Sequence, residues 1–142
     1  MVFNKNSFKY CILGSVSLVL GLSVYVVFRP GTYVAKFIFG NFCKCCIADT
    51  FWVLNNNFIK FHFADFLWAF SFACFLHAIF EPALIGSLLC AALTGTFGMV
   101  YECLQYFDVV GGTGDLIDCL FYMISGVVVV AMGLILKGGR KK

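Results

Sequence analysis

Polar and ionisable side chains gather where two long apolar segments of the chain meet. Glu102 and Gln105 close one of these segments, and Asp115 and Asp118 open the next. A carboxylate at membrane depth costs roughly 3 kcal/mol or more, so such groups usually face a protein interior or a water-filled cavity. We therefore expect the function of this chain to lie at this junction.

The chemistry open to the junction is that of grouped carboxylates. Asp65 adds a fourth carboxylate, and the last three apolar segments contain no Lys or Arg. Grouped carboxylates can share a proton because their charges repel one another, or they can bind a divalent cation through oxygen ligands. Arg29, Lys60 or a cationic ligand headgroup could instead balance the charge. We predict no cofactor apart from such a cation, and Glu102 and Asp118 are the candidates for a general base.

The composition is that of an integral membrane protein with a single domain. Of the 142 residues, 62% are hydrophobic and 12% are charged, whereas soluble domains carry about 25% charged residues. The mean hydropathy is +0.97. Four apolar stretches approach or reach the length of about 20 residues that spans a bilayer. They cover residues 10–28, 61–80, 83–106 and 116–136, and the first is too long for a signal-peptide core, which favours a retained anchor.

Helical spacing places the polar groups on one face of each segment. Glu102 follows Gly98 by four residues, and Tyr122 follows Asp118 by four residues, so each pair shares a helix face. Small residues on these faces allow membrane helices to pack closely. We therefore predict an all-α protein, a compact bundle of four transmembrane helices. Seven side chains then form a binding site at one membrane level: His62, Asp65, Glu102, Gln105, Asp115, Asp118 and Tyr122.

Basic residues in the flanks predict the orientation. Lys5 and Lys9 precede the first segment, and a basic cluster ends the chain. Lys and Arg are enriched in cytoplasmic loops, so both termini are predicted to be cytoplasmic and the polar site to face outward. Basic residues between positions 29 and 60 argue for the opposite orientation. The terminal cluster favours contact with anionic membrane lipids, and nothing indicates nucleic-acid binding.

The stretch from 29 to 60 is rich in aromatic residues but is broken by polar ones. This pattern predicts a segment at the membrane interface rather than a span. Cys43, Cys45 and Cys46 cluster in it. A zinc site needs about four ligands, so we interpret these cysteines as unpaired or partly paired thiols, with a metal or redox role as the alternative. The eight cysteines do not have the pattern of a disulfide framework.

Short motifs around the junction resemble the VanZ-like superfamily, which is named for a teicoplanin-resistance membrane protein. The motifs are Tyr101-Glu102-Cys103-Leu104-Gln105-Tyr106-Phe107, then Gly112-Thr113-Gly114-Asp115-Leu116-Ile117-Asp118, then Tyr122 and Gly126. His62 matches the family's upstream Lys or His. The family's loop Arg is absent here, and Tyr122 stands where Asn is common. The resemblance implies a bacterial inner-membrane protein with a role in the cell envelope or in glycopeptide resistance.

Three functions are compatible with these observations. The first is binding of a lipid headgroup or a lipid-linked envelope component by the outward carboxylates. The second is acid–base catalysis on a lipid-linked substrate within the membrane. The third is a small ion or carboxylate carrier, although transporters usually show internal repeats and none is visible. A Ser-His-Asp arrangement, a phosphate-binding glycine loop and paired metal-binding histidines are all missing from the sequence. The sequence does not determine the oligomeric state.

Overall fold

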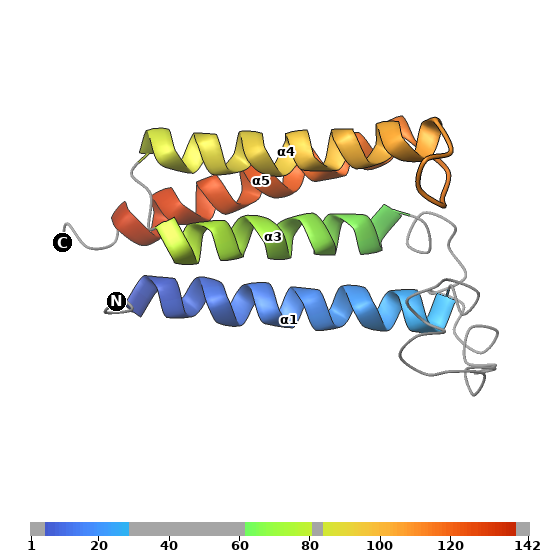
Figure 1. The fold of residues 1–142 in the computed structure, drawn as a ribbon. Coiled ribbons are helices and arrows are strands. Elements are labelled where there is room, and N and C mark those ends of the chain that lie inside the picture. Colours follow the sequence, from blue (N-terminus) through green and yellow to red (C-terminus); the bar gives the residue numbers. More distant parts are fainter. Residues whose placement is uncertain (1–4, 29–61, 81–83, 139–142) are drawn as a thin grey trace.

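A computed structural model describes residues 5–28, 62–80 and 84–138 (Figure 1). These residues form four helices and no strand: α1 (Lys5–Phe28), α3 (Ala64–Phe80), α4 (Leu84–Tyr106) and α5 (Leu116–Gly138). The predicted all-helical fold is therefore confirmed for this part of the chain. The predicted interfacial segment, the cysteine cluster within it and, apart from Lys137, the terminal basic cluster lie outside the described residues.

Three of the helices are long and apolar enough to cross a membrane. They contain the stretches Asn6–Val24, Leu84–Tyr106 and Leu116–Ile135. Helix α3 is equally apolar but has only 17 residues. It begins at Ala64 rather than at residue 61, because His62 and Phe63 form a wider turn ahead of it. Helix α1 begins earlier than predicted, since Lys5 and Lys9 are part of the helix.

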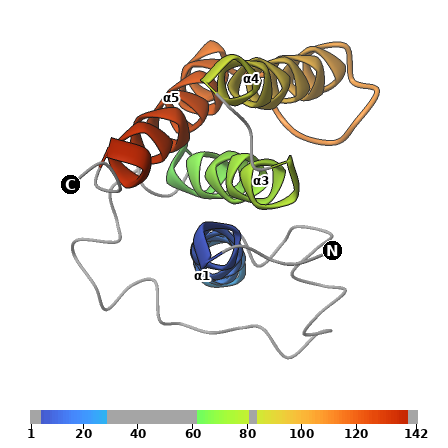
Figure 2. The ribbon, with the colours of Figure 1, turned by 90° about the vertical axis from the view of Figure 1, so that its left-hand side faces the viewer.

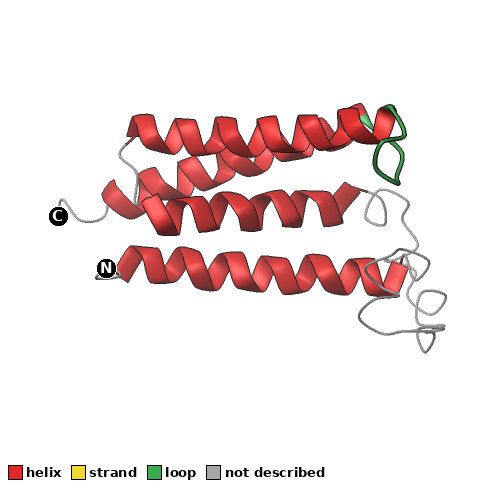
Figure 3. Ribbon diagram, in the orientation of Figure 1, coloured by secondary structure: helices red, strands yellow, loops and turns green. Residues whose placement is uncertain are grey.

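Helix α3 lies at the centre of the arrangement. It packs against α1 on one side and against α4 and α5 on the other, and α4 and α5 pack against each other (Figures 1 and 2). Successive helices run in opposite directions. The starts of α3 and α5 and the end of α4 therefore lie at one end of the molecule, which we call the hairpin end. The loop from α4 to α5 closes this end (Figure 3).

The contact between α1 and α3 combines small side chains with a buried hydrogen bond. The Ser17 hydroxyl on α1 donates a hydrogen bond of 3.0 Å to the Leu67 carbonyl on α3. Near the opposite end of the same contact, the rings of Tyr10 and His77 lie 5.5 Å apart. His77 also donates from Nδ1 to the Ala73 carbonyl within its own helix, at 3.0 Å. This bond gives His77 a structural role.

The interior is built from small and polar residues, and the exterior from large apolar ones. The fully or nearly fully buried side chains include Ala64, Ala73, Ser71, Thr94 and Ser125. Large apolar side chains face outward on all four helices, among them Phe8, Ile79, Ile85 and Leu116. A water-soluble protein buries such residues, whereas membrane helices associate through small and polar side chains. The packing therefore agrees with helices surrounded by lipid.

Candidate functional site

The loop between α4 and α5 satisfies the last carbonyl groups of α4. The amide of Asp108 donates to the carbonyl of Gln105 at 3.0 Å, and that of Val109 donates to the carbonyl of Leu104 at 2.9 Å. Asp108 adopts a positive φ of 55°, a conformation that Asp and Asn tolerate better than most residues. These bonds end α4 and turn the chain into the loop.

Asp115 connects the loop to both helices. Its carboxylate Oδ1 accepts the amide hydrogen of Ile117 at 2.9 Å. This bond caps the N-terminus of α5, since Asp is among the residues preferred at that position. Its own amide donates to Oε2 of Glu102 on α4, at 2.9 Å. Asp115 therefore fixes where α5 begins relative to the end of α4.

Glu102 is the most deeply placed carboxylate of the site, with 5% of its surface exposed. Its second oxygen, Oε1, accepts a hydrogen bond of 3.1 Å from the Tyr122 hydroxyl on α5. The Tyr122 ring lies directly on the backbone of Gly98, where a Cβ would come within 2.1 Å of the ring. Glycine at this position lets the ring lie flat between α4 and α5 and brings its hydroxyl to Glu102.

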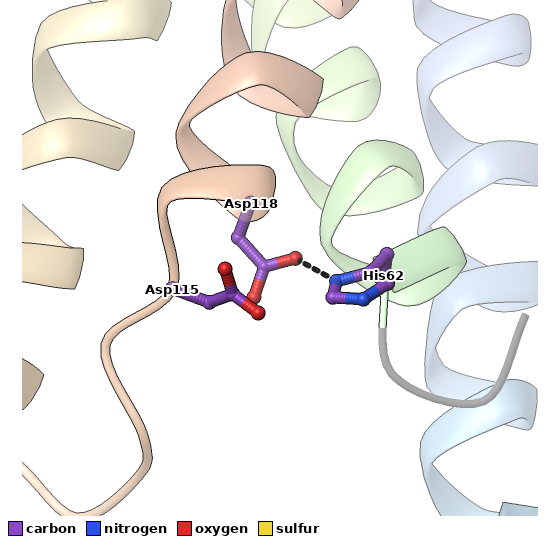
Figure 4. Close-up of side chains that lie close together, drawn as sticks. All are labelled: His62, Asp115 and Asp118. Carbon is purple, nitrogen blue, oxygen red and sulfur yellow. Dashed lines mark hydrogen bonds and ion pairs between the residues drawn. The ribbon is translucent and has the colours of Figure 1, made fainter. Parts of the chain in front are cut away.

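His62 and Asp118 form the second polar pair. His62 Nδ1 and Asp118 Oδ1 are 2.7 Å apart, with 14% and 11% of the two side chains exposed (Figure 4). The ring of Phe121 stacks against the His62 ring at a centroid distance of 6.1 Å. Phe121 was missed in the sequence, although it lies one turn after Asp118 and so shares its face. The pair remains open to the surface at the hairpin end.

Asp115 links the two pairs into one site. Its carboxylate lies beside the Asp118 carboxylate and the His62 ring, and the three side chains offer ligand atoms within 4.8 Å of one another (Figure 4). The wider group of His62, Glu102, Asp115, Asp118 and Tyr122 is called the hairpin site below. Of these residues, Glu102, Tyr122 and Asp118 are buried, and His62 and Asp115 are partly exposed.

The two remaining predicted site residues lie at the edge of this group. Asp65 is buried on α3, and its carboxylate is within electrostatic range of the Tyr122 hydroxyl. The Gln105 amide instead packs against Gly112 of the loop, where a Cβ would come within 2.5 Å of it. Among the described residues, no hydrogen bond joins Gln105 to Glu102 or Asp118.

The basic residues of the described helices belong to segments far from the hairpin site. Lys5 and Lys9 are at the start of α1, and Lys137 is at the end of α5. Both of these helix ends lie at the opposite end of the molecule from the site (Figure 1). Within the described residues, His62 is therefore the only side chain at the site that can carry a positive charge.

No family model, curated protein or solved structure matches this chain.

Proposed function

We propose that the hairpin site binds the headgroup of a lipid or of a lipid-linked cell-envelope component. One observation carries this proposal. Carboxylates from α4 and α5 and a histidine ahead of α3 meet at one end of an otherwise apolar molecule, and they remain partly open to its surface. Headgroups reside at this depth of a bilayer. Placing ionisable residues within membrane segments costs free energy, so residues of this kind are candidates for function by default.

The proposal includes four spans in a bacterial inner membrane, with both termini cytoplasmic and the hairpin site outside. The 17 residues of α3 extend over about 26 Å at 1.5 Å per residue. This length is close to the hydrocarbon thickness of about 30 Å, and a bilayer can thin locally to match a short span.

We predict that reporters placed after Lys142 and near Asn56 lie on opposite sides of the membrane. Each span reverses the side of the membrane on which the following loop lies. Three of the four proposed spans separate Asn56 from Lys142, so these two positions lie on opposite sides. Alkaline phosphatase and green fluorescent protein fusions at both positions measure this directly. Signals from the same side at both positions would rule out the four-span topology.

A role in the cell envelope is part of the proposal because of the VanZ-like motifs. Glu102, Asp115 and Asp118, which belong to those motifs, also meet in the hairpin site. The family's reference protein confers teicoplanin resistance, so glycopeptide resistance is the phenotype to examine. Testing a deletion strain against envelope-targeting antibiotics, together with lipid analysis, would show which pathway depends on the protein.

Lipids that copurify with the protein test the binding proposal. The protein is purified in mild detergent, and its retained lipids are extracted and identified by mass spectrometry. Wild type is expected to retain one lipid class in stoichiometric amounts. Glu102→Gln is expected to retain roughly tenfold less, because Gln leaves the Asp115 amide or the Tyr122 hydroxyl without its acceptor, at about 1–3 kcal/mol, and so loosens the site. Asp108→Asn is the matched control. It removes one negative charge from the same hairpin at an exposed position whose φ of 55° suits Asn.

Equal lipid retention by wild type, Glu102→Gln and Asp108→Asn would contradict headgroup binding at this site. An equal loss of lipid in Glu102→Gln and Asp108→Asn would show only that the negative charge of the hairpin matters. The proposal requires the loss to be specific to Glu102.

The second candidate function is acid–base catalysis on a lipid-linked substrate. The observation that favours it is the pairing of His62 with Asp118 at 2.7 Å, because a carboxylate that orients a histidine is a common feature of general-base sites. Asp118→Asn separates the two functions. An enzyme would lose nearly all turnover while keeping bound substrate, whereas a binding protein would lose ligand in proportion to the weakened contact.

A further inference from the structure

The proposed headgroup site is rich in negative charge, although most membrane headgroups that carry a net charge carry an anionic phosphate. Glu102, Asp115 and Asp118 contribute three carboxylates. Among the described residues only His62 can offset them, since Lys5 and Lys9 belong to the start of α1 and Lys137 to the end of α5, and these helix ends lie at the other end of the molecule. Such a site repels a phosphate unless a cation lies between the two.

We infer that His62, Asp115 and Asp118 bind a divalent metal ion, which in turn recruits a phosphate-bearing headgroup. The ligand atoms of these residues lie within 4.8 Å of one another. Atoms bound to one ion at about 2.1 Å each are typically about 3–3.5 Å apart. Small side-chain rotations therefore bring the three residues into coordination distance. Recruitment of a headgroup rests on the proposed function, whereas binding of the metal ion does not.

His62 distinguishes this group from a mere cluster of acids. The ring nitrogen Nδ1 points at Asp118, as Figure 4 shows, and Phe121 holds the ring in that orientation by stacking. One imidazole with two carboxylates suits Mn²⁺, Fe²⁺ or Zn²⁺, whereas Ca²⁺ and Mg²⁺ prefer oxygen ligands alone. The expected ion is therefore a transition-metal dication.

The surrounding bonds keep the ligands in place and leave the ion accessible. One oxygen of Asp115 is used by the Ile117 amide, so the other is available to a metal. The Asp115 backbone is itself held by Glu102, and such supporting bonds commonly change metal affinity by about 10–100-fold. Three protein ligands leave coordination positions open, as in zinc sites that bind water or substrate. Those positions are where a phosphate oxygen would bind.

The metal part is tested with Mn²⁺ alone, by electron paramagnetic resonance on the full chain purified in detergent without added lipid. Wild type is expected to bind one Mn²⁺ per chain. Asp118→Asn and His62→Gln are each expected to weaken binding by about 100-fold or more, since loss of a residue that only supports a ligand already costs about 10–100-fold, and Asp108→Asn is expected to leave it unchanged. Circular dichroism and gel filtration on every variant identify any that fail to fold. His62→Gln serves as the second variant because His62 precedes α3 and its replacement leaves the helices intact.

Nanodiscs that contain a phosphate-bearing anionic lipid, compared with nanodiscs of zwitterionic lipid alone, test the headgroup part. Retention of the anionic lipid is measured with Mn²⁺ and with EDTA, and at least tenfold more retention is expected with the metal. Failure of wild type to bind Mn²⁺, or equal Mn²⁺ binding by Asp118→Asn, overturns the inference. Lipid retention that ignores EDTA but falls in Glu102→Gln also overturns it and leaves the proposed function standing. Specific Mn²⁺ binding without any lipid retention supports the metal site and contradicts the proposed function.

Discussion

Replacing Gly98 with alanine is expected to destabilise the protein more than the same replacement at the helical glycines Gly14, Gly21, Gly95, Gly126 or Gly133. A Cβ at this position would lie 2.1 Å from two ring atoms of Tyr122 and 2.6 Å from its Cβ. The atoms in the way belong to the inner part of the side chain, so the ring cannot move aside without α5 moving too. Overpacking of this kind costs about 1–3 kcal/mol.

Gly95→Ala is the matched control, one turn earlier on the same helix. Its Cβ would meet only the Cγ of Met123, at 3.6 Å, an ordinary contact distance. Alanine favours helix over glycine by about 1 kcal/mol, and both variants gain this term. Thermal unfolding in detergent should therefore show a lower Tm for Gly98→Ala and an equal or higher Tm for Gly95→Ala. Equal shifts in the two variants would contradict the close packing of Tyr122 on Gly98.

Replacing Glu102 with alanine is expected to release the start of α5. In the wild type the Asp115 amide and the Tyr122 hydroxyl both donate to Glu102, at 2.9 Å and 3.1 Å. Alanine leaves both donors without their acceptor, and each buried group left unsatisfied costs about 1–3 kcal/mol. Since about 1.4 kcal/mol corresponds to a tenfold change in an equilibrium, the Asp115 amide should exchange with solvent tenfold faster or more.

Hydrogen–deuterium exchange of the peptide that contains Asp115 measures this effect. Glu102→Gln should fall between wild type and alanine, because its single carbonyl oxygen can accept from only one side. Tyr122→Phe provides the comparison on the other bond. It removes the hydroxyl but keeps the acceptor for the Asp115 amide, so protection at Asp115 should persist. Exchange that rises equally in Tyr122→Phe and Glu102→Ala would show that the Asp115–Glu102 bond does not hold the loop.

Much of the helical architecture follows from the sequence because apolar length and turn residues determine it. The predicted segments 83–106 and 116–136 correspond to α4 at Leu84–Tyr106 and α5 at Leu116–Gly138. The starts of α1 and α3 were less well predicted. Polar residues such as Lys5 and Asn6 join the first turn of α1, and the wide turn at His62 delays α3. Hydropathy records neither effect, since both depend on local backbone hydrogen bonding.

The shared level of the polar residues could also be predicted, because antiparallel helices bring the start of one segment beside the end of the next. The contacts that each polar side chain makes could not be predicted. Helical spacing placed Gln105 on the same face as Glu102, yet the return of the loop places Gly112 against its amide. The sequence likewise grouped Asp115 with the other acids without revealing that it caps α5 through Ile117. Partner choice depends on loop conformation, and a residue pattern alone does not determine that.

The direct test of the central claim, that Glu102 and Asp118 serve one ligand site, is a double-mutant cycle on lipid retention. The amount of copurifying lipid is measured for wild type, Glu102→Gln, Asp118→Asn and the double variant, with Asp108→Asn as the reference for lost charge. Residues in one network show interaction energies of about 0.5–3 kcal/mol, whereas independent sites add. We predict that the double variant retains about as much lipid as whichever of the two single variants retains less. Fully additive losses, or no loss in either single variant, would contradict a single site at the hairpin end.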